Sequence, residues 1–219
     1  MMAQRLLLPF KRGMMLCGYK NPQYEKHWGY AHYGIDISAR QGGAGDDDGV
    51  YSPGAGVVLA AGHDNTLGYG AAVLYSTCTD RSGETHDLVA RYMHMRELYV
   101  SAGDAVDTSS LIGREGKEGT EDYHLHLELD TDTDYPLYTP QVSRGHTLWK
   151  KGRDTTVNPS LWLYKSDDRA LVSPTYNPAW LNTEDFCIPQ ADSYESTRAR
   201  LLALINEMEK EIENIPEGA

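Results

Sequence analysis

The sequence predicts a mainly β protein with a helix at its C-terminal end, and three observations support this. The chain has 219 residues, of which 15 are Tyr, only 2 are Phe, 21 are Gly and 10 are Pro. Tyr favours half-exposed strands, and this density of Gly and Pro indicates many turns. Short apolar runs alternate with turn residues as far as residue 163, and a helical pattern follows only near the C-terminus.

Five apolar runs are expected to form the strands of a body that covers 1–164. They are Gly34–Ile37, Gly56–Ala61, Ala71–Ser76, Asp87–Met93 and Tyr123–Asp130. We expect turns at Tyr69-Gly70 and at Arg81–Glu84, because Gly and Ser are frequent turn residues. The Gly- and Asp-rich segment Gln41–Gly49 is expected to be a loop.

The last quarter of the chain changes character. Residues 165–190 show no sustained period and are interrupted by proline, so we expect a connecting arm. Residues 191–219 are expected to form a helix with an apolar stripe at heptad spacing, made by Leu201, Ile205, Met208, Ile212 and Ile215. Two alternatives stay open for burying this stripe: the body of the same chain, or a partner copy in a homo-oligomer.

Charge and composition exclude several classes of function. The chain has 20 Lys and Arg against 32 Asp and Glu, a net charge of −12. A nucleic-acid binder needs a basic surface, and anionic lipid would repel this chain, so we expect neither partner. No apolar run approaches the ~18–20 residues that a membrane-spanning helix needs, so no membrane insertion is expected.

The cysteines and the N-terminus suggest where the protein is made. Cys17, Cys78 and Cys187 are far apart, so we expect free thiols in a reducing compartment and no cysteine-based zinc site. The apolar run Leu6–Leu8 stops at Pro9, too early for a secretory signal, so synthesis in the cytoplasm is expected.

The strongest chemical signal is the run YHLHLELD at Tyr123–Asp130. Alternate side chains of a strand share a face, so the three leucines are expected to face a core. His124, His126 and Glu128 then lie together on the other face. Such a strand can offer one imidazole to a metal and another to a substrate, although histidines on an exposed edge strand are the alternative.

Two further segments offer histidines. His32 and Asp36 are separated by three residues, and imidazole and carboxylate are both zinc ligands; a surface pair is the alternative. Gly34 lies between them and allows a close backbone approach or a bulge. His94 stands among apolar residues near a strand end, where a structural core histidine is the alternative.

Taken in order, these motifs resemble those of one peptidase family. The chain carries H-x-x-x-D, then GAGVVLAAG, GYGAAVLY, YMHM, HLHLEL and VNPSLWL. From about Leu8 to Leu163 this order resembles the lysostaphin/LytM-type zinc metalloendopeptidases, which cut peptide bonds in bacterial peptidoglycan. The resemblance implies an antiparallel β body of the LytM/lysostaphin type, similar to a duplicated hybrid motif.

The resemblance also implies roles for individual residues. One Zn²⁺ per chain would be held by His32, Asp36 and His126, while His94 and His124 would be catalytic without binding the metal. No H-E-x-x-H motif supplies a glutamate base, so these two histidines would share proton transfer and oxyanion stabilisation. Glu128 would orient one of the histidines or lie solvated at the rim. The expected lining of the substrate groove is Tyr33, Tyr69 and Tyr123.

The expected function is therefore a zinc-dependent endopeptidase that hydrolyses peptide stems or cross-bridges of peptidoglycan. A phage or prophage lysin (an endolysin), made in the cytoplasm and released to the cell wall, fits these expectations. The alternatives are a non-catalytic LytM-like module that binds cell wall, a structural module of a phage particle, and a zinc hydrolase of ordinary proteins. Two departures from the family pattern leave the substrate preference open: the acidic loop at 46–48, and Asp122-Tyr123 in place of Gly-Pro.

Overall fold

The computed structural model describes residues 3–41, 43, 45, 47–65, 67–133, 154–172, 177–191, 202–203 and 205–210. The first strands are β1 (Leu6–Leu7), β2 (Arg12–Cys17), β3 (Ile35–Ser38), β4 (Gly49–Tyr51), β5 (Gly56–Asp64), β6 (Gly68–Thr79) and β7 (Thr85–Met95). The remaining strands are β8 (Glu97–Leu98), β9 (Ala105–Val106), β10 (Leu111–Arg114), β11 (Leu125–Asp130), β12 (Thr156–Val157), β13 (Leu163–Tyr164) and β14 (Ala170–Leu171). The helices of the body are short: α1 (Pro22–Trp28), η1 (Pro159–Leu161), η2 (Pro178–Trp180) and α3 (Thr183–Phe186).

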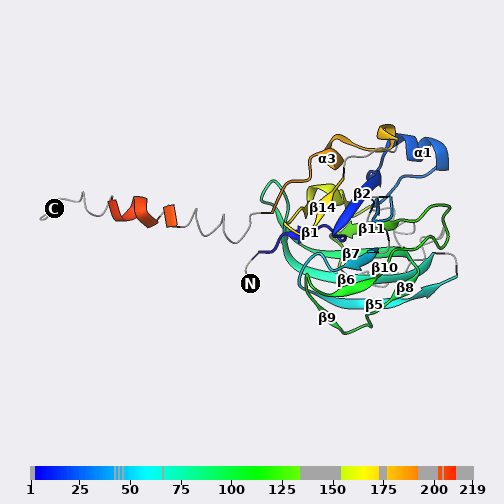
Figure 1. Cartoon of the computed structure of the whole chain (residues 1–219), viewed down its shortest axis with the longest axis horizontal. Helices are drawn as coiled ribbons and strands as arrows, with labels where there is room; N and C mark the ends of the chain where they lie inside the picture. The colour runs from blue at the N-terminus through cyan, green and yellow to red at the C-terminus, as the bar shows by residue number, and fades with distance from the viewer. Residues whose placement is uncertain are drawn as a thin grey trace, which may run out of the picture.

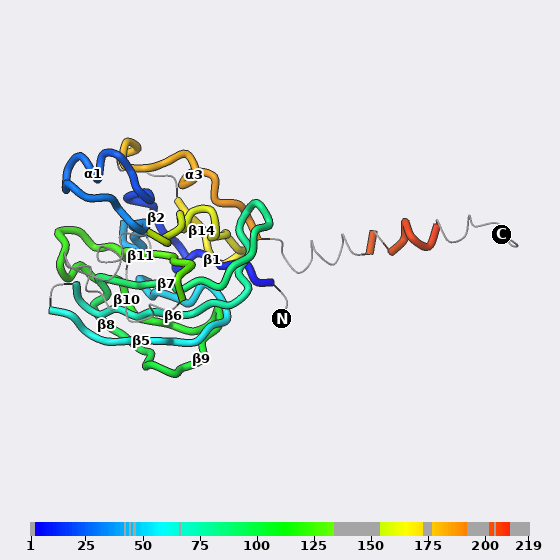
Figure 2. Tube along the Cα trace, turned by 180° about the vertical axis from the view of Figure 1, so that it is seen from behind, coloured from blue at the N-terminus to red at the C-terminus, as the bar shows by residue number. Residues whose placement is uncertain are grey.

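One large, mostly antiparallel sheet dominates the described part of the chain. Its strands follow the order β14-β2-β3-β11-β7-β6-β5-β9, and β12 pairs with β11 beside this path. Two small sheets accompany it, β4-β10-β8 and β1-β13. Parallel pairing occurs between β14 and β2 and between β1 and β13. In Figures 1 and 2, α1 and α3 lie at the end of the body opposite β9.

The core forms because the inward-facing residues of β11 and its neighbours are apolar. Leu125, Leu127 and Leu129 are fully buried, as the alternating pattern predicted. Ile35 and Ile37 of β3 are buried beside them, since β3 pairs with β11 in antiparallel register. A fully buried leucine contributes roughly 1.5–3 kcal/mol, so these strands fix the register that places the polar face of β11.

The mainly β fold is confirmed, with some differences in detail. All five predicted strands form, and several are longer than predicted. The turn predicted at Tyr69-Gly70 is wrong, because both residues lie inside β6, where Tyr69 is opposite His63 of β5. Residues 65 and 67 are turn residues instead, and Gly68 takes a positive φ of 75°, which glycine adopts readily. Of the predicted loop, Gly49 already belongs to β4.

The turn at Arg81–Glu84 is confirmed and has a clear cause. Asp80 Oδ1 accepts hydrogen bonds from the backbone N–H groups of Ser82 and Glu84, each at 2.8 Å. An aspartate that caps its own following turn in this way stabilises the connection between β6 and β7.

The expected connecting arm packs on the body in its described part. β14 pairs with β2, and Ile188 is buried in the core with 3% of its surface exposed. Asp185 is also buried, where its carboxylate accepts a hydrogen bond from the Ser160 hydroxyl. Whether residues 165–190 form a unit distinct from the body stays a prediction.

The described residues at 202–203 and 205–210 are helical, in agreement with a C-terminal helix. Ile205 and Met208 of the predicted stripe are 49% and 61% exposed in the single chain, so these two do not pack on the body (Figure 1). Leu201, Ile212 and Ile215 lie outside the described residues, and burial against a partner copy stays a prediction. Among the described residues, no helix has the length and apolar character that crossing a membrane requires.

Candidate metal and catalytic site

The register of β11 brings three metal-ligand types together. His126 lies directly opposite Asp36 of β3 and opposite Met93 of β7, one residue before His94. His32 comes from the segment between α1 and β3 and is 1% exposed. The structure therefore gathers the three expected ligands from parts of the chain that are up to 94 residues apart.

The three donor atoms form a nearly equilateral triangle. His32 Nε2 is 3.1 Å from Asp36 Oδ1 and 3.0 Å from His126 Nδ1, and His126 Nδ1 is 2.9 Å from Asp36 Oδ1. Tetrahedral zinc with ligands at ~2.0–2.2 Å separates neighbouring ligand atoms by ~3.3–3.6 Å. The triangle needs to open by only about 0.3–0.5 Å to accept such an ion.

The outer nitrogens of both imidazoles are held in place by acceptors. His32 Nδ1 donates to the Gly18 carbonyl at 2.9 Å, and His126 Nε2 donates to Glu128 Oε1 at 3.2 Å. In a neutral imidazole the other nitrogen then carries a bare lone pair, and in both residues this nitrogen faces the triangle. Three electron-pair donors thus converge on one point, which favours a cation there.

The pKa values show the same preference for positive charge. Burial alone would lower the pKa of His126, but the hydrogen bonds to Asp36 and Glu128 raise it to about 10. Burial alone would raise the pKa of Asp36, but the neighbouring imidazoles of His32, His124 and His126 hold it well below its usual value. Both shifts show that the surroundings of the triangle favour positive charge.

A buried ion-pair chain lies behind His126. Glu128 is 1% exposed and accepts a hydrogen bond from Arg91 Nη1 at 3.2 Å, while Arg91 Nη2 donates to Asp130 at 2.6 Å. Glu128 and Arg91 are directly opposite each other in the β11–β7 register. Glu128 is therefore in a position to orient His126, a role that stays a prediction, and it is not solvated at the rim in this structure.

His94 and His124 lie beside the triangle, and the same kind of hydrogen bond holds both rings. Each donates from Nδ1 to a backbone carbonyl, His94 to Glu118 at 2.7 Å and His124 to Asp122 at 3.0 Å. Their ring centroids are 5.0 Å apart, and His124 Nε2 is 3.6 Å from Asp36 Oδ1. In the neutral rings, both Nε2 atoms are therefore free of hydrogen and able to accept a proton.

Local backbone features place His94. His94 has φ of 65°, a left-handed conformation that is rare for a residue with a side chain, and it lies within the irregularity of the β6–β7 pairing between Tyr92 and Met95. Such conformations cluster at functional sites, where the surrounding structure maintains them. Burial, with the nearby His124 and His126, lowers the pKa of His94 to about 4, and burial also lowers the pKa of His124.

Gly34 leaves room for the ligands, as its position between His32 and Asp36 suggested. A Cβ at Gly34 would lie 2.4 Å from the Leu127 carbonyl oxygen and 2.8 Å from His126 Nε2. Any side chain there would push β11 and its histidine away.

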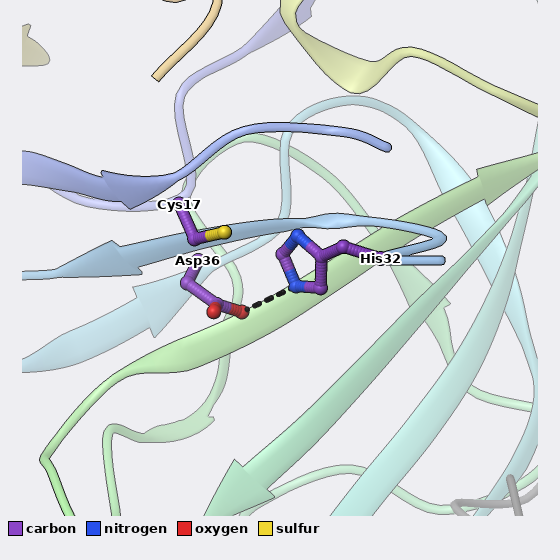
Figure 3. A group of neighbouring side chains, drawn as sticks. All are labelled: Cys17, His32 and Asp36. Atoms are coloured by element: carbon purple, nitrogen blue, oxygen red, sulfur yellow. Dashed lines mark hydrogen bonds and ion pairs between the residues drawn. The ribbon is translucent and has the colours of Figure 1, made fainter. Parts of the chain in front are cut away.

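The structure adds Cys17 to the surroundings of the site, although the sequence predicted no cysteine-based zinc site. Its Sγ forms a looser donor group with His32 and Asp36, with ligand atoms within 4.8 Å of one another (Figure 3). Cys17 is opposite Asp36 in the β2–β3 pairing, and burial and the Asp36 charge raise the pKa of its thiol. A protonated thiol is a poor ligand, so the tighter triangle is the better candidate. Only the pairing of β2 with β3 shows that Cys17 lies beside Asp36, and the sequence did not predict that pairing.

Asp48 of the acidic loop is also unexpected in its role. It is fully buried and ion-paired with Arg40 at 2.7 Å, with Arg114 at 2.9 Å and with Arg96. Burial alone would raise the pKa of Asp48, but the three guanidinium groups lower it. Arg40 also lies over the ring of Tyr123 at 4.4 Å, which fixes the loop beside His124. The sequence of the acidic loop does not predict these ion pairs of Asp48.

The tyrosines expected in the groove flank the site residues in sequence and strand pairing. Tyr33 and Tyr123 directly follow and precede ligand or catalytic histidines, and Tyr69 is opposite Met95, next to His94. All three are partly exposed. Their contact with substrate stays a prediction.

Comparison with solved structures places this geometry on a known fold. The SpoIIQ–SpoIIIAH pore forming complex contains a chain with 18% identity and a TM-score of 0.50, covering 74% of this chain and 92% of that one. The catalytic domain of prophage-encoded M23 protein EnpA from Enterococcus faecalis has 22% identity and a TM-score of 0.43, with coverage of 55% and 82%. Lysostaphin from Staphylococcus simulans has 21% identity and a TM-score of 0.42, with coverage of 61% and 48%. At these identities the likeness concerns the fold alone.

A search of curated proteins gave no significant match. The model of peptidase family M23 matches residues 30–136, a range that contains His32, Asp36, His94, His124 and His126. Residues 30–136 therefore belong to peptidase family M23, the LytM/lysostaphin-type family that the motifs of this chain resemble.

Proposed function

We propose that this protein is a zinc-dependent endopeptidase that hydrolyses peptide stems or cross-bridges of bacterial peptidoglycan. One observation carries the proposal: His32 Nε2, Asp36 Oδ1 and His126 Nδ1 converge within 2.9–3.1 Å of one another, with the imidazole N–H groups directed outward. Three protein ligands of this kind leave a fourth tetrahedral position open, as catalytic zinc sites do.

The residues present fit the metal. Two neutral imidazoles and one carboxylate would hold zinc with a net charge of about +1 at the site. When bound, zinc would supply Lewis-acid polarisation of the scissile carbonyl and a lower pKa for water.

The proton transfers fall to His94 and His124. Both Nδ1 atoms are engaged with backbone carbonyls, so each Nε2 can accept the proton that the attacking water loses. The same proton can then pass to the nitrogen of the departing amine, which restores the neutral imidazole. The negative charge of the developing oxyanion favours uptake of a solvent proton at Nε2 of the second imidazole, which then donates a hydrogen bond to the oxyanion.

The deciding experiment uses purified peptidoglycan sacculi of several cross-bridge types. Mass spectrometry of the released fragments should show new peptide termini with the wild-type chain, and chelator or His126→Ala should abolish them. His86→Ala is a matched control, because His86 is a half-exposed histidine paired with Glu84 on the surface. No fragments from any sacculus, with zinc bound, would refute the proposal.

A non-catalytic module is the second candidate. The structure with a TM-score of 0.50 is named as part of a pore forming complex, which is an assembly. Under this alternative, cell-wall affinity persists and no fragment appears. A structural phage-particle module predicts instead that deleting 191–219 changes the mass in solution. Action on the cell wall after release, in a phage or prophage lysin, remains part of our proposal.

A further inference from the structure

An aromatic patch lies next to the candidate metal site. It consists of the rings of Tyr24, His27 and Trp28 in α1, Tyr30 just after α1, and Trp180 in η2. The Tyr24 ring stacks on the imidazole of His32 with centroids 4.3 Å apart and 27° between the planes. The patch is therefore continuous with the site through Tyr24.

The rings support one another while their outer faces stay open to solvent. Trp180 contacts Tyr24 edge-on at 6.2 Å and His27 at 5.8 Å, and His27 contacts Trp28 at 4.8 Å. Trp28 is 50% exposed and Tyr30 is 40% exposed. Exposed Trp and Tyr gathered in one place mark binding surfaces, since they are enriched where partners bind.

α1 presents these rings without packing into the core. None of its residues is buried, and its ends are fixed by the Asn21 side chain, which accepts from Gln23 N at 2.9 Å, and by Gly29 in the left-handed conformation at φ 78°. A seven-residue helix with no buried residue contributes little core stability. Its capped ends and unburied side chains suit presentation of the rings to a ligand.

The chemistry of the patch selects an uncharged ring ligand. Every member is a flat ring with an N–H or O–H at its edge, and the Tyr24 hydroxyl donates to the Tyr30 hydroxyl at 3.3 Å. Charges on α1 balance, with Glu25 opposed by the neighbouring Lys26. A sugar ring has an apolar C–H face for stacking and hydroxyls at its edge for such donors and acceptors, and it carries no charge to be repelled by a −12 chain.

We propose that the aromatic patch binds the glycan strand of peptidoglycan through the apolar faces of its N-acetylated pyranose rings. The inference rests on the proposed function, because peptide stems are attached to that glycan. Binding the strand over α1 holds an attached stem near His32, through the Tyr24 contact, and so raises its local concentration at the site.

The test uses an uncharged β-1,4-linked N-acetylglucosamine hexamer and the full chain. Binding is followed by calorimetry and by NMR line broadening, and folding by thermal unfolding. Trp28→Ala should weaken binding at least tenfold, and Tyr30→Phe should retain it, since stacking needs the ring alone. Phe186→Ala is the matched control, because Phe186 is a 53% exposed aromatic residue of α3 outside the patch.

Failure of this inference is separable from failure of the proposed function. A wild-type chain that binds no hexamer, or a folded Trp28→Ala variant that binds it as well as wild type, overturns the glycan site. A dimer that Trp28→Ala converts to monomer, without sugar binding, assigns the patch to a second copy and also overturns it. Cleavage of a glycan-free stem peptide is measured separately: sugar binding without that cleavage counts against the peptidase, and cleavage without sugar binding counts against the patch alone.

Discussion

Replacing Glu128 with Gln should weaken zinc binding by about 10–100-fold, which is the usual effect of removing a carboxylate that orients a ligating histidine. In free energy this is about 1.4–2.7 kcal/mol. The structure supplies the reason, because Glu128 Oε1 accepts from His126 Nε2 at 3.2 Å and both partners are shielded from solvent. Gln keeps the shape but loses the charge that favours the ligating tautomer.

The variant should still fold. Gln has one acceptor oxygen where Glu has two, so either His126 or Arg91 loses a hydrogen-bond acceptor, at a cost of about 1–3 kcal/mol. Arg91 keeps its ion pair with Asp130 at 2.6 Å, so the guanidinium is not left without an anion. Urea unfolding of the metal-free variant measures this cost separately from zinc affinity.

Competition with a chromophoric chelator gives the zinc affinity, and a surface pair provides the control. Glu84 contacts His86 Nε2 at 2.8 Å with the same two-residue spacing, but its side chain is 64% exposed. Glu84→Gln should leave zinc affinity unchanged. If folded Glu128→Gln binds zinc as tightly as wild type, the orienting role of Glu128 is wrong.

Three other outcomes follow from the geometry. His94→Ala and His124→Ala should each retain zinc and lose ~10²–10⁴-fold in turnover of a soluble stem peptide; wild-type turnover in either would remove that residue from the mechanism. Gly34→Ala should lower both zinc affinity and thermal stability, because the new Cβ would meet the Leu127 carbonyl oxygen at 2.4 Å; a crystal structure with an unmoved β11 would contradict this. The free energy of unfolding of the metal-free protein should fall by up to about 3 kcal/mol as the pH falls from 6.5 to about 4. The reason is that the lowered pKa of His94 keeps the folded ring neutral while the unfolded chain takes up a proton. Urea unfolding with chelator at several pH values measures how steeply the free energy of unfolding depends on pH, and His94→Asn should reduce this dependence. An equal dependence in both proteins would show that another group takes up the proton.

Much of the β fold and the arrangement of the site residues could be predicted from local patterns. Alternation in the run at Tyr123–Asp130 places three leucines in the core and His124, His126 and Glu128 on the other face, and the structure agrees. The order of motifs identifies the family, and the same order indicates His32 and Asp36 as companions of His126. The grouping of these residues in space was therefore predictable, although their roles remain to be tested.

The rest depends on pairing between distant segments, which no local pattern contains. β2 is a six-residue strand whose apolar run is too short to be recognised, so the position of Cys17 opposite Asp36 could not be predicted. Asp48 lies in an acidic loop, and it is ion-paired with the nearby Arg40 and with Arg96 and Arg114 from distant parts of the chain. The turn predicted at Tyr69-Gly70 is wrong because Gly68 and Gly70 are equally good turn residues by sequence, and only Gly68 has a positive φ.

The most direct test of the metal assignment is the zinc K-edge X-ray absorption spectrum of the zinc-loaded full chain. Ligation by His32, Asp36 and His126 predicts a first shell of nitrogen and oxygen at ~2.0–2.2 Å, with imidazole scattering and no sulfur. The looser group that includes Cys17 predicts a sulfur neighbour at ~2.3 Å. We predict a shell of nitrogen and oxygen that loses imidazole scattering in His126→Ala. A zinc–sulfur contribution that disappears in Cys17→Ala would contradict the assignment.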